Sequence, residues 1–409
     1  MSNLSNVWFK VTDLTVASGR GCRVTTVDGH EYLDFAGGLG TISTGHCHPK
    51  VVAAIQAQAE RFVHAQANVY THDLLETLAS KLDAITPASI DTFFFANSGA
   101  EITEAAVKLA KQVTGRPNTI VFQGSYHGRT HLTMAMSTSK SVFRAGHAPL
   151  PAGVHVTTFP DPLASDQEAT INASLRAFDR LLATQTAPSE TACVILEPVL
   201  GEGGYIPAPT AFVEGIVDRC REHGILFIAD EIQSGFGRTG DWFVVDRLEI
   251  EPDILIMGKG MGSGFPISAL GTRRELDDRW PTGSHGCTYG GNPIGCAAAI
   301  ATIEVMSEPG FMDNVRTRGQ QLRDGLFELK EREPSLRQVR GPGVMVGCSF
   351  DDADRVPTML EHCRRDGQLL LLRAGTFGNI VRWVPPLVVS GDEIDEALEA
   401  FGAALRATA

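Results

Sequence analysis

Short, uninterrupted apolar runs limit the folds open to this chain of 409 residues more than any other feature. Each run leads into polar residues or glycine, and the runs lie at 93–96, 119–122, 193–196, 225–229 and 254–257. Strands that are apolar throughout suit a sheet buried on both faces, which is usually parallel and covered by helices. Helical patterns lie between the runs, over 100–113, 174–183 and 209–223. This alternation predicts an α/β domain with a mostly parallel central sheet.

The last hundred residues have a different pattern. A long helix is expected from 312 to about 331, and short strands follow at 344–350, 369–372 and 380–384. A final helix begins at Ser390 with the spacing of a capping box.

Near the start of the chain, Asp28-Gly29 predicts a hairpin turn. We expect these first residues to pack with the C-terminal part. The predicted large domain spans 49–308, and a smaller α+β domain combines 1–48 with 309–409.

Charge and cysteine content exclude several function classes. The chain has 35 Lys and Arg against 48 Asp and Glu, a net charge of -13, which disfavours binding to nucleic acid or anionic membranes. No apolar run is long enough to span a bilayer, and the first residues do not resemble a secretory signal. The eight cysteines form no C-x-x-C pair, so we expect reduced thiols and a cytoplasmic protein. His46-Cys47-His48 lacks a second ligand pair, so no metal site is expected.

Four chemically versatile side chains follow the predicted strands. They are Ser98, Tyr126, Asp230 and Lys259. Open α/β sheets bind ligands at the carboxyl ends of their strands, so we expect these side chains to converge.

Each of these residues also has a simpler interpretation. Ser98 could bind an anion at a helix N-terminus or could be an ordinary helix cap. Asp230 could be a metal ligand, a cap or the partner of a protonated heterocycle, because a buried carboxylate needs a cation or several donors. Lys259 could act as a nucleophile or base, or could extend to the surface.

Taken together, the motifs closely resemble those of the class III aminotransferases, which are pyridoxal 5'-phosphate (PLP) enzymes. The most specific matches are at 229–240 and 288–293, and further matches lie at 94–101 and 258–260. The resemblance implies the aspartate-aminotransferase-like fold (PLP fold type I). It also implies an active transaminase that cycles between PLP and pyridoxamine phosphate.

The resemblance assigns roles to residues around the cofactor. Lys259 is similar to the Schiff-base lysine, and Asp230 to the partner of the protonated pyridine nitrogen. Tyr126 is similar to the residue that stacks on the ring, with Ile232 on the opposite face and Gln233 near the phenolic oxygen. The other implied cofactor contacts are Ser98, Gly99, Ala100, His127 and Thr288. Thr288 resembles a residue lent by a neighbouring subunit, which implies a homodimer with its active site at the interface; whether two such dimers form a tetramer stays open.

The substrate residues resemble those of 4-aminobutyrate aminotransferases. Arg382 matches the arginine that grips an α-carboxylate, and Glu202 matches the glutamate that neutralises it. Arg129 matches the residue that binds the distal carboxylate, and Leu39 occupies a pocket position that is aliphatic in those enzymes. These matches imply transfer of an amino group from an ω-amino acid to 2-oxoglutarate.

Other activities stay open on the same scaffold. Leu200 replaces a common glutamine, and Leu39 is not the usual isoleucine, so the substrate could differ. The alternatives are an amino-acid racemase or epimerase, an acetylornithine or ornithine aminotransferase, and an amine:pyruvate aminotransferase. A cofactor-binding module without turnover is disfavoured because Lys259 and Asp230 are both present.

Overall fold

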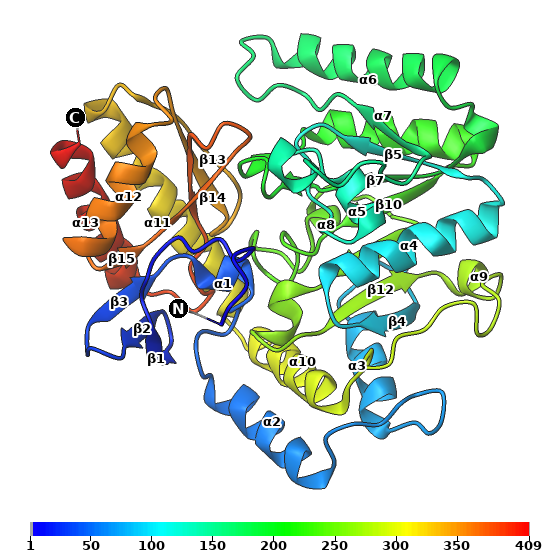
Figure 1. The fold of residues 1–409 in the computed structure, drawn as a ribbon, viewed down its shortest axis with the longest axis horizontal. Helices are drawn as coiled ribbons and strands as arrows, with labels where there is room; N and C mark the ends of the chain where they lie inside the picture. Colours follow the sequence, from blue (N-terminus) through cyan, green and yellow to red (C-terminus); the bar gives the residue numbers. More distant parts are fainter. Residues whose placement is uncertain (1–2, 409) are drawn as a thin grey trace.

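A seven-stranded sheet forms the centre of the computed structural model, which describes residues 3–408 (Figure 1). Its strands are parallel except β12, which is antiparallel to both of its neighbours. In spatial order they are β4 (Thr92–Ala96), β12 (Ser268–Thr272), β11 (Ile254–Met257), β10 (Leu226–Asp230), β7 (Thr191–Leu196), β5 (Asn118–Phe122) and β6 (Val154–Thr157). The expected mostly parallel sheet of an α/β domain is confirmed.

Both faces of this sheet are buried, which explains why its strands are apolar throughout. Alternate residues of a strand point to opposite faces. Ile228 packs with helix α4 (Gly99–Thr114), whereas Phe227 and Ala229 pack in the core that contains helix α7 (Thr210–His223). The remaining helices of this part are α2 (Pro49–Arg61), α3 (Asp73–Asp83), α5 (His131–Met136), α6 (Gln167–Thr184), α8 (Val244–Arg247), α9 (Arg274–Asp277) and α10 (Pro293–Met306).

Two four-stranded sheets with their own helices form the other lobe, on the left in Figure 1. One sheet contains β13 (Leu336–Arg340), β14 (Val346–Phe350), β17 (Ile380–Trp383) and β16 (Leu372–Ala374). The other contains β1 (Val16–Arg20), β2 (Arg23–Thr26), β3 (Glu31–Asp34) and β15 (Leu369–Leu370). The helices are α11 (Phe311–Arg332), α12 (Arg355–Arg365) and α13 (Gly391–Ala407).

The N-terminal strands join the C-terminal part through hydrogen bonds. Strand β15 pairs in parallel with β3, and β2 and β3 form the hairpin expected around Asp28-Gly29. The division at 48/49 and 308/309 stays a prediction. Met1, Ser2 and Ala409, which that prediction includes, lie outside the described residues.

One expectation about local structure was wrong, and the helix expected at 174–183 is longer than predicted. The single strand expected at 369–372 is two strands, because the chain leaves β15 in one sheet and enters β16 in the other at Leu371. An apolar run carries no information about which sheet each residue joins. Helix α6 begins at Gln167 rather than 174, since Asp166 caps it by accepting a hydrogen bond from the Ala169 N–H at 2.9 Å. Its first turns are polar and gave no apolar period.

Several shorter elements complete the path of the chain. They are α1 (Gly37–Gly40), β8 (Val199–Leu200), β9 (Ile206–Pro207) and the 3₁₀ turns Ser141–Phe143, Pro188–Glu190 and Lys259–Gly262. The capping box at Ser390 is confirmed, with its side chain and that of Glu393 bonding each other's backbone N–H. Among residues 3–408, no helix combines the length and apolar character needed to cross a membrane.

Trp383 is a sensitive test of how the terminal segments are joined. Its buried ring meets Phe35 beyond β3 and Phe401 of α13 edge-on, at centroid distances of 5.8 and 5.0 Å. We expect Trp383→Ala to destabilise this lobe by about 3–5 kcal/mol, because it opens a large cavity. Far-UV circular dichroism during urea unfolding measures the loss. Phe377→Ala is the control, since Phe377 is 83% exposed and should change stability by less than about 0.5 kcal/mol. Equal losses in both variants would contradict this account.

Candidate functional site

A buried pair of side chains lies at the carboxyl end of β10. Asp230 is the last residue of that strand, and its Oδ2 accepts a hydrogen bond from His127 Nδ1 at 2.7 Å. Asp230 Oδ1 accepts from the Ile232 N–H at 3.1 Å. Burial alone would lower the pKa of His127, but the hydrogen bond and charge of Asp230 raise it. The buried Asp230 carboxylate therefore has a hydrogen-bond partner on each of its two oxygens.

Lys259 follows the neighbouring strand β11. It begins a 3₁₀ turn with a φ of 44°, an unusual conformation for a residue other than glycine. Burial lowers the pKa of Lys259 to about 8, partly offset by the charge of Glu202. About a tenth of this amine is therefore neutral and nucleophilic at pH 7, far more than for an ordinary lysine.

The N-terminus of helix α4 lies at the same edge of the sheet. Ser98 caps it by accepting from the Glu101 N–H at 3.3 Å, so the expected capping role is present. The Ser268 hydroxyl donates to the Ser98 carbonyl at 3.0 Å and ties this turn to β12. A Cβ on Gly128 would lie 2.7 Å from the Ala100 Cβ, so the loop after β5 closes against the helix start. The first N–H groups of α4 and its dipole provide a place for a phosphate.

Ile232 and Gln233 extend from the loop after β10 across this region. A Cβ on Gly99 would meet Ile232 at 3.1 Å, and one on Gly258 would meet it at 3.5 Å, so Ile232 lies between the helix start and the Lys259 turn. Gln233 Nε2 donates to the carbonyl of Leu39 at 3.2 Å, while its Oε1 is buried without a hydrogen-bond partner among the described residues. Burying an acceptor without a hydrogen bond is unfavourable in free energy, unless a bound ligand donates to this oxygen.

Glu202 and Arg382 form an ion pair next to Lys259. Arg382 Nη1 donates to Glu202 Oε1 at 2.5 Å, and the two side chains are 6% and 18% exposed. Burial would raise the pKa of Glu202, but the charge of Arg382 holds it below its usual value. The pair is therefore not a surface salt bridge, because both side chains are largely buried. Breaking such a pair leaves one uncompensated charge.

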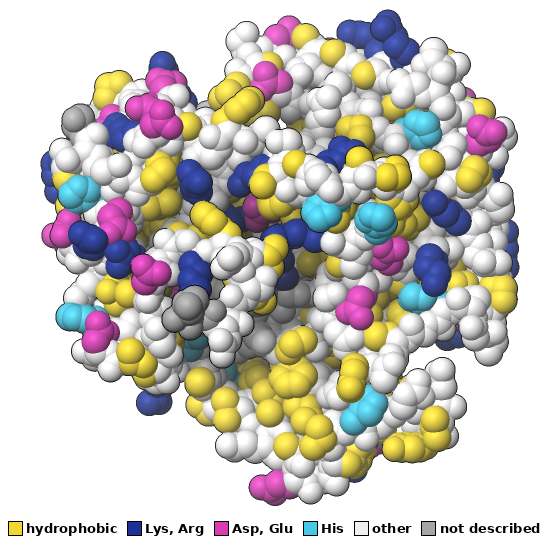
Figure 2. All heavy atoms as spheres, viewed as in Figure 1, with side chains coloured by type: hydrophobic (Ala, Val, Ile, Leu, Met, Phe, Trp, Pro, Cys, Tyr) yellow, Lys and Arg dark blue, Asp and Glu magenta, His cyan; other side chains and the backbone are white. Residues whose placement is uncertain are grey.

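Arg129 and Leu39 lie on the exposed side of the site. Arg129 Nε donates to the Tyr126 hydroxyl at 3.0 Å, and its guanidinium lies 5.2 Å from the ring centroid of Phe143. Leu39 is 44% exposed and lies in α1 with a φ of 67°. On the face in Figure 2, Lys and Arg side chains gather in the hollow between the two lobes. These cations suit a carboxylate substrate.

Thr288 is the one predicted site residue that no described contact joins to the others. It is exposed in the loop before α10. The adjacent Cys287 Sγ accepts from Asn97 Nδ2 at 3.0 Å, so this loop begins beside the α4 start. A role for Thr288 in a neighbouring subunit stays a prediction.

Two further residues of the site were missed by the sequence analysis. Glu197, at the end of β7, accepts from the Tyr126 N–H at 2.7 Å and the Gly201 N–H at 2.9 Å. Burial raises the pKa of Glu197 to about 7. A signal existed, because Glu197 follows a buried strand just as Asp230 does. The second residue is Lys140, which precedes a short 3₁₀ turn. Burial lowers the pKa of Lys140, partly offset by the charge of Glu202. No sequence motif marks this lysine.

These features fit PLP. The α4 start suits its phosphate, the Asp230–His127 pair suits a protonated pyridine nitrogen, and the neutral form of Lys259 suits an aldehyde. The unpaired buried Gln233 Oε1 marks space for a polar group of the cofactor. Among the described residues, no cluster of three or more His, Cys, Asp or Glu could hold a metal ion.

Comparisons with known proteins agree with this site. The pattern of the family described as "Aminotransferase class-III" matches residues 5–405. The chain is 36% identical to a probable 4-aminobutyrate aminotransferase of Bacillus subtilis, over 95% of this chain and 92% of that one. It is 38% identical to an acetylornithine aminotransferase of Archaeoglobus fulgidus, over 94% of each chain.

A solved structure gives the same result for the fold. A PLP-bound amine transaminase from an uncultivated Pseudomonas species is similar with a TM-score of 0.92 and 28% identity, over 100% of this chain and 98% of that one. The PLP fold type I architecture expected from the sequence is confirmed. Amino acids and keto acids are the substrates expected of such enzymes. This chain belongs to the class III aminotransferases and is a PLP-dependent transaminase.

Proposed function

We propose that the protein transfers the amino group of an ω-amino acid similar to 4-aminobutyrate to 2-oxoglutarate. The observation that carries this proposal is the buried Glu202–Arg382 ion pair beside Lys259. The two half-reactions bring different groups to Arg382. A 2-oxoglutarate molecule brings an α-carboxylate to it, whereas an ω-amino acid brings only hydrogen atoms next to its amino group.

Glu202 allows one site to accept both substrates. With an ω-amino acid bound, Glu202 keeps Arg382 paired, so no buried charge is left unsatisfied. When 2-oxoglutarate binds, the Glu202 side chain moves away from Arg382. The α-carboxylate of 2-oxoglutarate then forms a bidentate ion pair with the Arg382 guanidinium. One anion replaces another at the guanidinium, so the cost of the exchange is small.

Arg129 is proposed to hold the carboxylate that is remote from the reacting carbon in both half-reactions. It lies against Tyr126 and Phe143, which limit its motion. The exposed Leu39 side chain contributes an apolar wall to the same entrance. Lys140 adds positive charge near Glu202 and favours a dicarboxylate.

The proposed chemical roles belong to Lys259 and Asp230. Bound PLP supplies an aldehyde and a ring that accepts electrons. Lys259 Nζ would hold the cofactor through that aldehyde and, when free, would act as the base and acid at the substrate carbon. Asp230 keeps the ring nitrogen protonated, and His127 orients that carboxylate. Tyr126 and Ile232 would hold the ring between them, and Gln233 would lie near its phenolic oxygen.

We also propose a homodimer in which Thr288 contacts the phosphate bound by the other subunit. Exposed apolar residues near the N-terminus also support a dimer, because Val7, Trp8 and Phe9 are 83%, 70% and 80% exposed. A second subunit would cover such an apolar surface. The cytoplasmic location inferred from the cysteines stays a prediction.

Lys259 should carry the cofactor. Borohydride reduction of the PLP-loaded protein, followed by peptide mapping, should place the pyridoxyl group on Lys259 and nowhere else. Because the pKa of Lys259 is about 8, cofactor uptake by the cofactor-free protein should speed up from pH 7 to pH 9 as the amine loses its proton. Lys140→Ala is the matched control and should keep the label. A label on another lysine would refute the assignment.

Glu202→Ala should separate the two half-reactions. We expect kcat/KM for 4-aminobutyrate to fall roughly 100-fold, because Arg382 is left unpaired beside the substrate, while the value for 2-oxoglutarate changes less than about threefold. Rapid-mixing absorbance of the bound cofactor measures each half-reaction separately. Glu333→Ala, which breaks a similarly buried ion pair with Arg355 in the other lobe, is the control. Equal losses in both half-reactions of Glu202→Ala would contradict the proposal.

Arg129→Ala should weaken dicarboxylic acceptors selectively. Loss of a charge-assisted hydrogen bond costs about 1.5–3 kcal/mol, so the KM for 2-oxoglutarate should rise roughly 10- to 100-fold. The KM for pyruvate, which lacks the distal carboxylate, should stay within about twofold. Arg129→Lys keeps the charge and should give a smaller rise. An unchanged ratio of the two KM values would count against Arg129.

A substrate panel distinguishes the proposal from its neighbours in the family. 4-Aminobutyrate, β-alanine, ornithine, N-acetylornithine, putrescine and isoleucine can each be tested for single-turnover conversion of the bound cofactor. Fastest conversion by N-acetylornithine would favour the activity named for the Archaeoglobus relative. Fastest conversion by 4-aminobutyrate would support the proposed function.

A further inference from the structure

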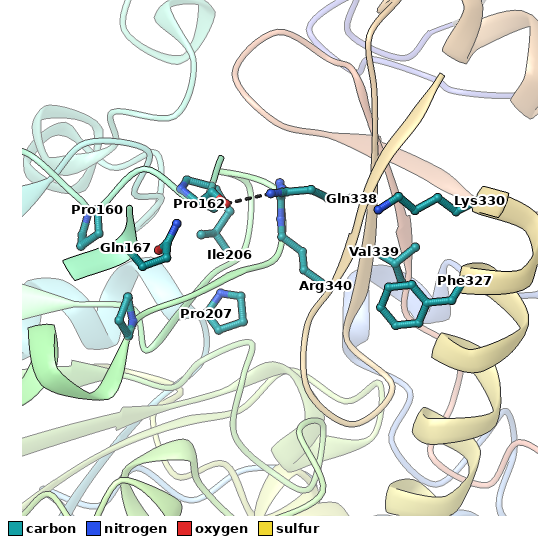
Figure 3. Close-up of a pocket in the computed structure, with 11 residues that line it drawn as sticks. Pro160, Pro162, Gln167, Ile206, Pro207, Phe327, Lys330, Gln338, Val339 and Arg340 are labelled. Atoms are coloured by element: carbon teal, nitrogen blue, oxygen red, sulfur yellow. Dashed lines mark hydrogen bonds between the residues drawn. The ribbon is translucent and has the colours of Figure 1, made fainter. Parts of the chain in front are cut away.

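Arg340 lies in β13, at the junction of the two lobes and away from the reacting groups. With Gln338 it lines a cavity of about 270 Å³ between α11 and the loops of the large sheet (Figure 3). Gln338 Nε2 donates to the carbonyl of Pro162 at 2.7 Å, which fastens the strand to the opposite lobe. Gln338 Oε1 in turn accepts from Arg340 Nη1. Gln338 therefore ties β13 to the loop at Pro162 and also orients the Arg340 side chain.

The guanidinium of Arg340 grips one backbone carbonyl. Its Nε and Nη2 donate to the Gly204 oxygen at 3.2 and 3.0 Å. Burial lowers the pKa of Arg340 to about 10, so it remains charged at neutral pH and the bonds remain charge-assisted. No carboxylate among the described residues forms an ion pair with Arg340. Its guanidinium instead donates hydrogen bonds to Gly204 and Gln338.

The gripped carbonyl belongs to an unusual turn. Gly204 has a φ of 119°, and a Cβ there would lie 2.1 Å from Ile380. The next residue, Tyr205, is fully buried with a φ of 55°, a left-handed conformation that a tyrosine adopts only where its surroundings enforce it. Gly375 N–H adds a bond to the Glu202 carbonyl at 3.0 Å. The turn that carries Glu202 thus contacts Arg340 of β13, Ile380 of β17 and Gly375 directly after β16, all in the other lobe.

We propose that Arg340 is a positioning residue that holds the 202–205 turn in the shape that brings Glu202 to Arg382. Without the two hydrogen bonds from Arg340, the peptide between Gly204 and Tyr205 can rotate toward an ordinary conformation. That rotation moves Glu202 away from Arg382. Arg340 then sets how often Arg382 is free to bind an α-carboxylate. The inference rests on the proposed function of the Glu202–Arg382 pair.

Arg340→Met tests this role through the ratio of the two half-reactions. We expect kcat/KM for 4-aminobutyrate to fall about tenfold, while kcat/KM for 2-oxoglutarate and the Kd for glutarate, an unreactive dicarboxylate, weaken less than about threefold. A purely structural role would lower the melting temperature and leave that ratio unchanged, which would overturn the proposal. Lys330→Met, on the wall of the same cavity, is the control and should leave the ratio unchanged.

Arg340→Lys provides a second variant that keeps the charge. A lysine can offer one hydrogen bond to Gly204 but no fork, so the ratio should shift about threefold. If Arg340→Met fails to fold, this shift decides the matter, and no shift overturns the proposal.

A double-mutant cycle separates this inference from the proposed function. If Arg340 acts through Glu202, adding Arg340→Met to Glu202→Ala should change the ratio less than about twofold further. No effect of Glu202→Ala on the ratio would refute the proposed function itself. An effect of Glu202→Ala without one of Arg340→Met would refute only the positioning role.

Discussion

Burial of charge at the carboxyl edge of one sheet is the constraint on which the rest of the structure depends. Asp230, Lys259 and Arg382 are all withdrawn from water, and each needs a partner or a shifted pKa to remain there. His127 donates a hydrogen bond to Asp230, and Glu202 forms an ion pair with Arg382. Burial lowers the pKa of Lys259 to about 8 instead, which leaves part of its amine neutral and reactive.

The two lobes contribute unequal parts of this arrangement. The large sheet supplies Asp230, Lys259 and the start of α4 from the carboxyl ends of β10, β11 and β4, which lie at one edge of the sheet. Arg382 comes from β17 in the other lobe, more than a hundred residues along the chain. The site therefore exists only when the lobes are docked. Contacts such as Gln338 to Pro162 at that junction are part of the active geometry.

Much of the large domain could be predicted because its strands are apolar throughout. Five runs became strands β4, β5, β7, β10 and β11 with small shifts in their ends. The antiparallel β12 was not foreseen, since it follows the Lys259 turn without a helix in between. In the small lobe, 369–372 was assigned to one strand, because short apolar runs do not reveal the sheet to which each residue belongs.

The amino-acid sequence by itself determined the family, the cofactor and the polar groups that follow the strands. These depend on local order along the chain, where each motif is contiguous. The contact between Glu202 and Arg382 was implied by the family resemblance, and the structure added that the pair is buried. Only the tertiary structure decided that Glu197 binds two loops and that Arg340 binds the Gly204 carbonyl. Such contacts join residues far apart in sequence, and their distances depend on how sheets and lobes pack together.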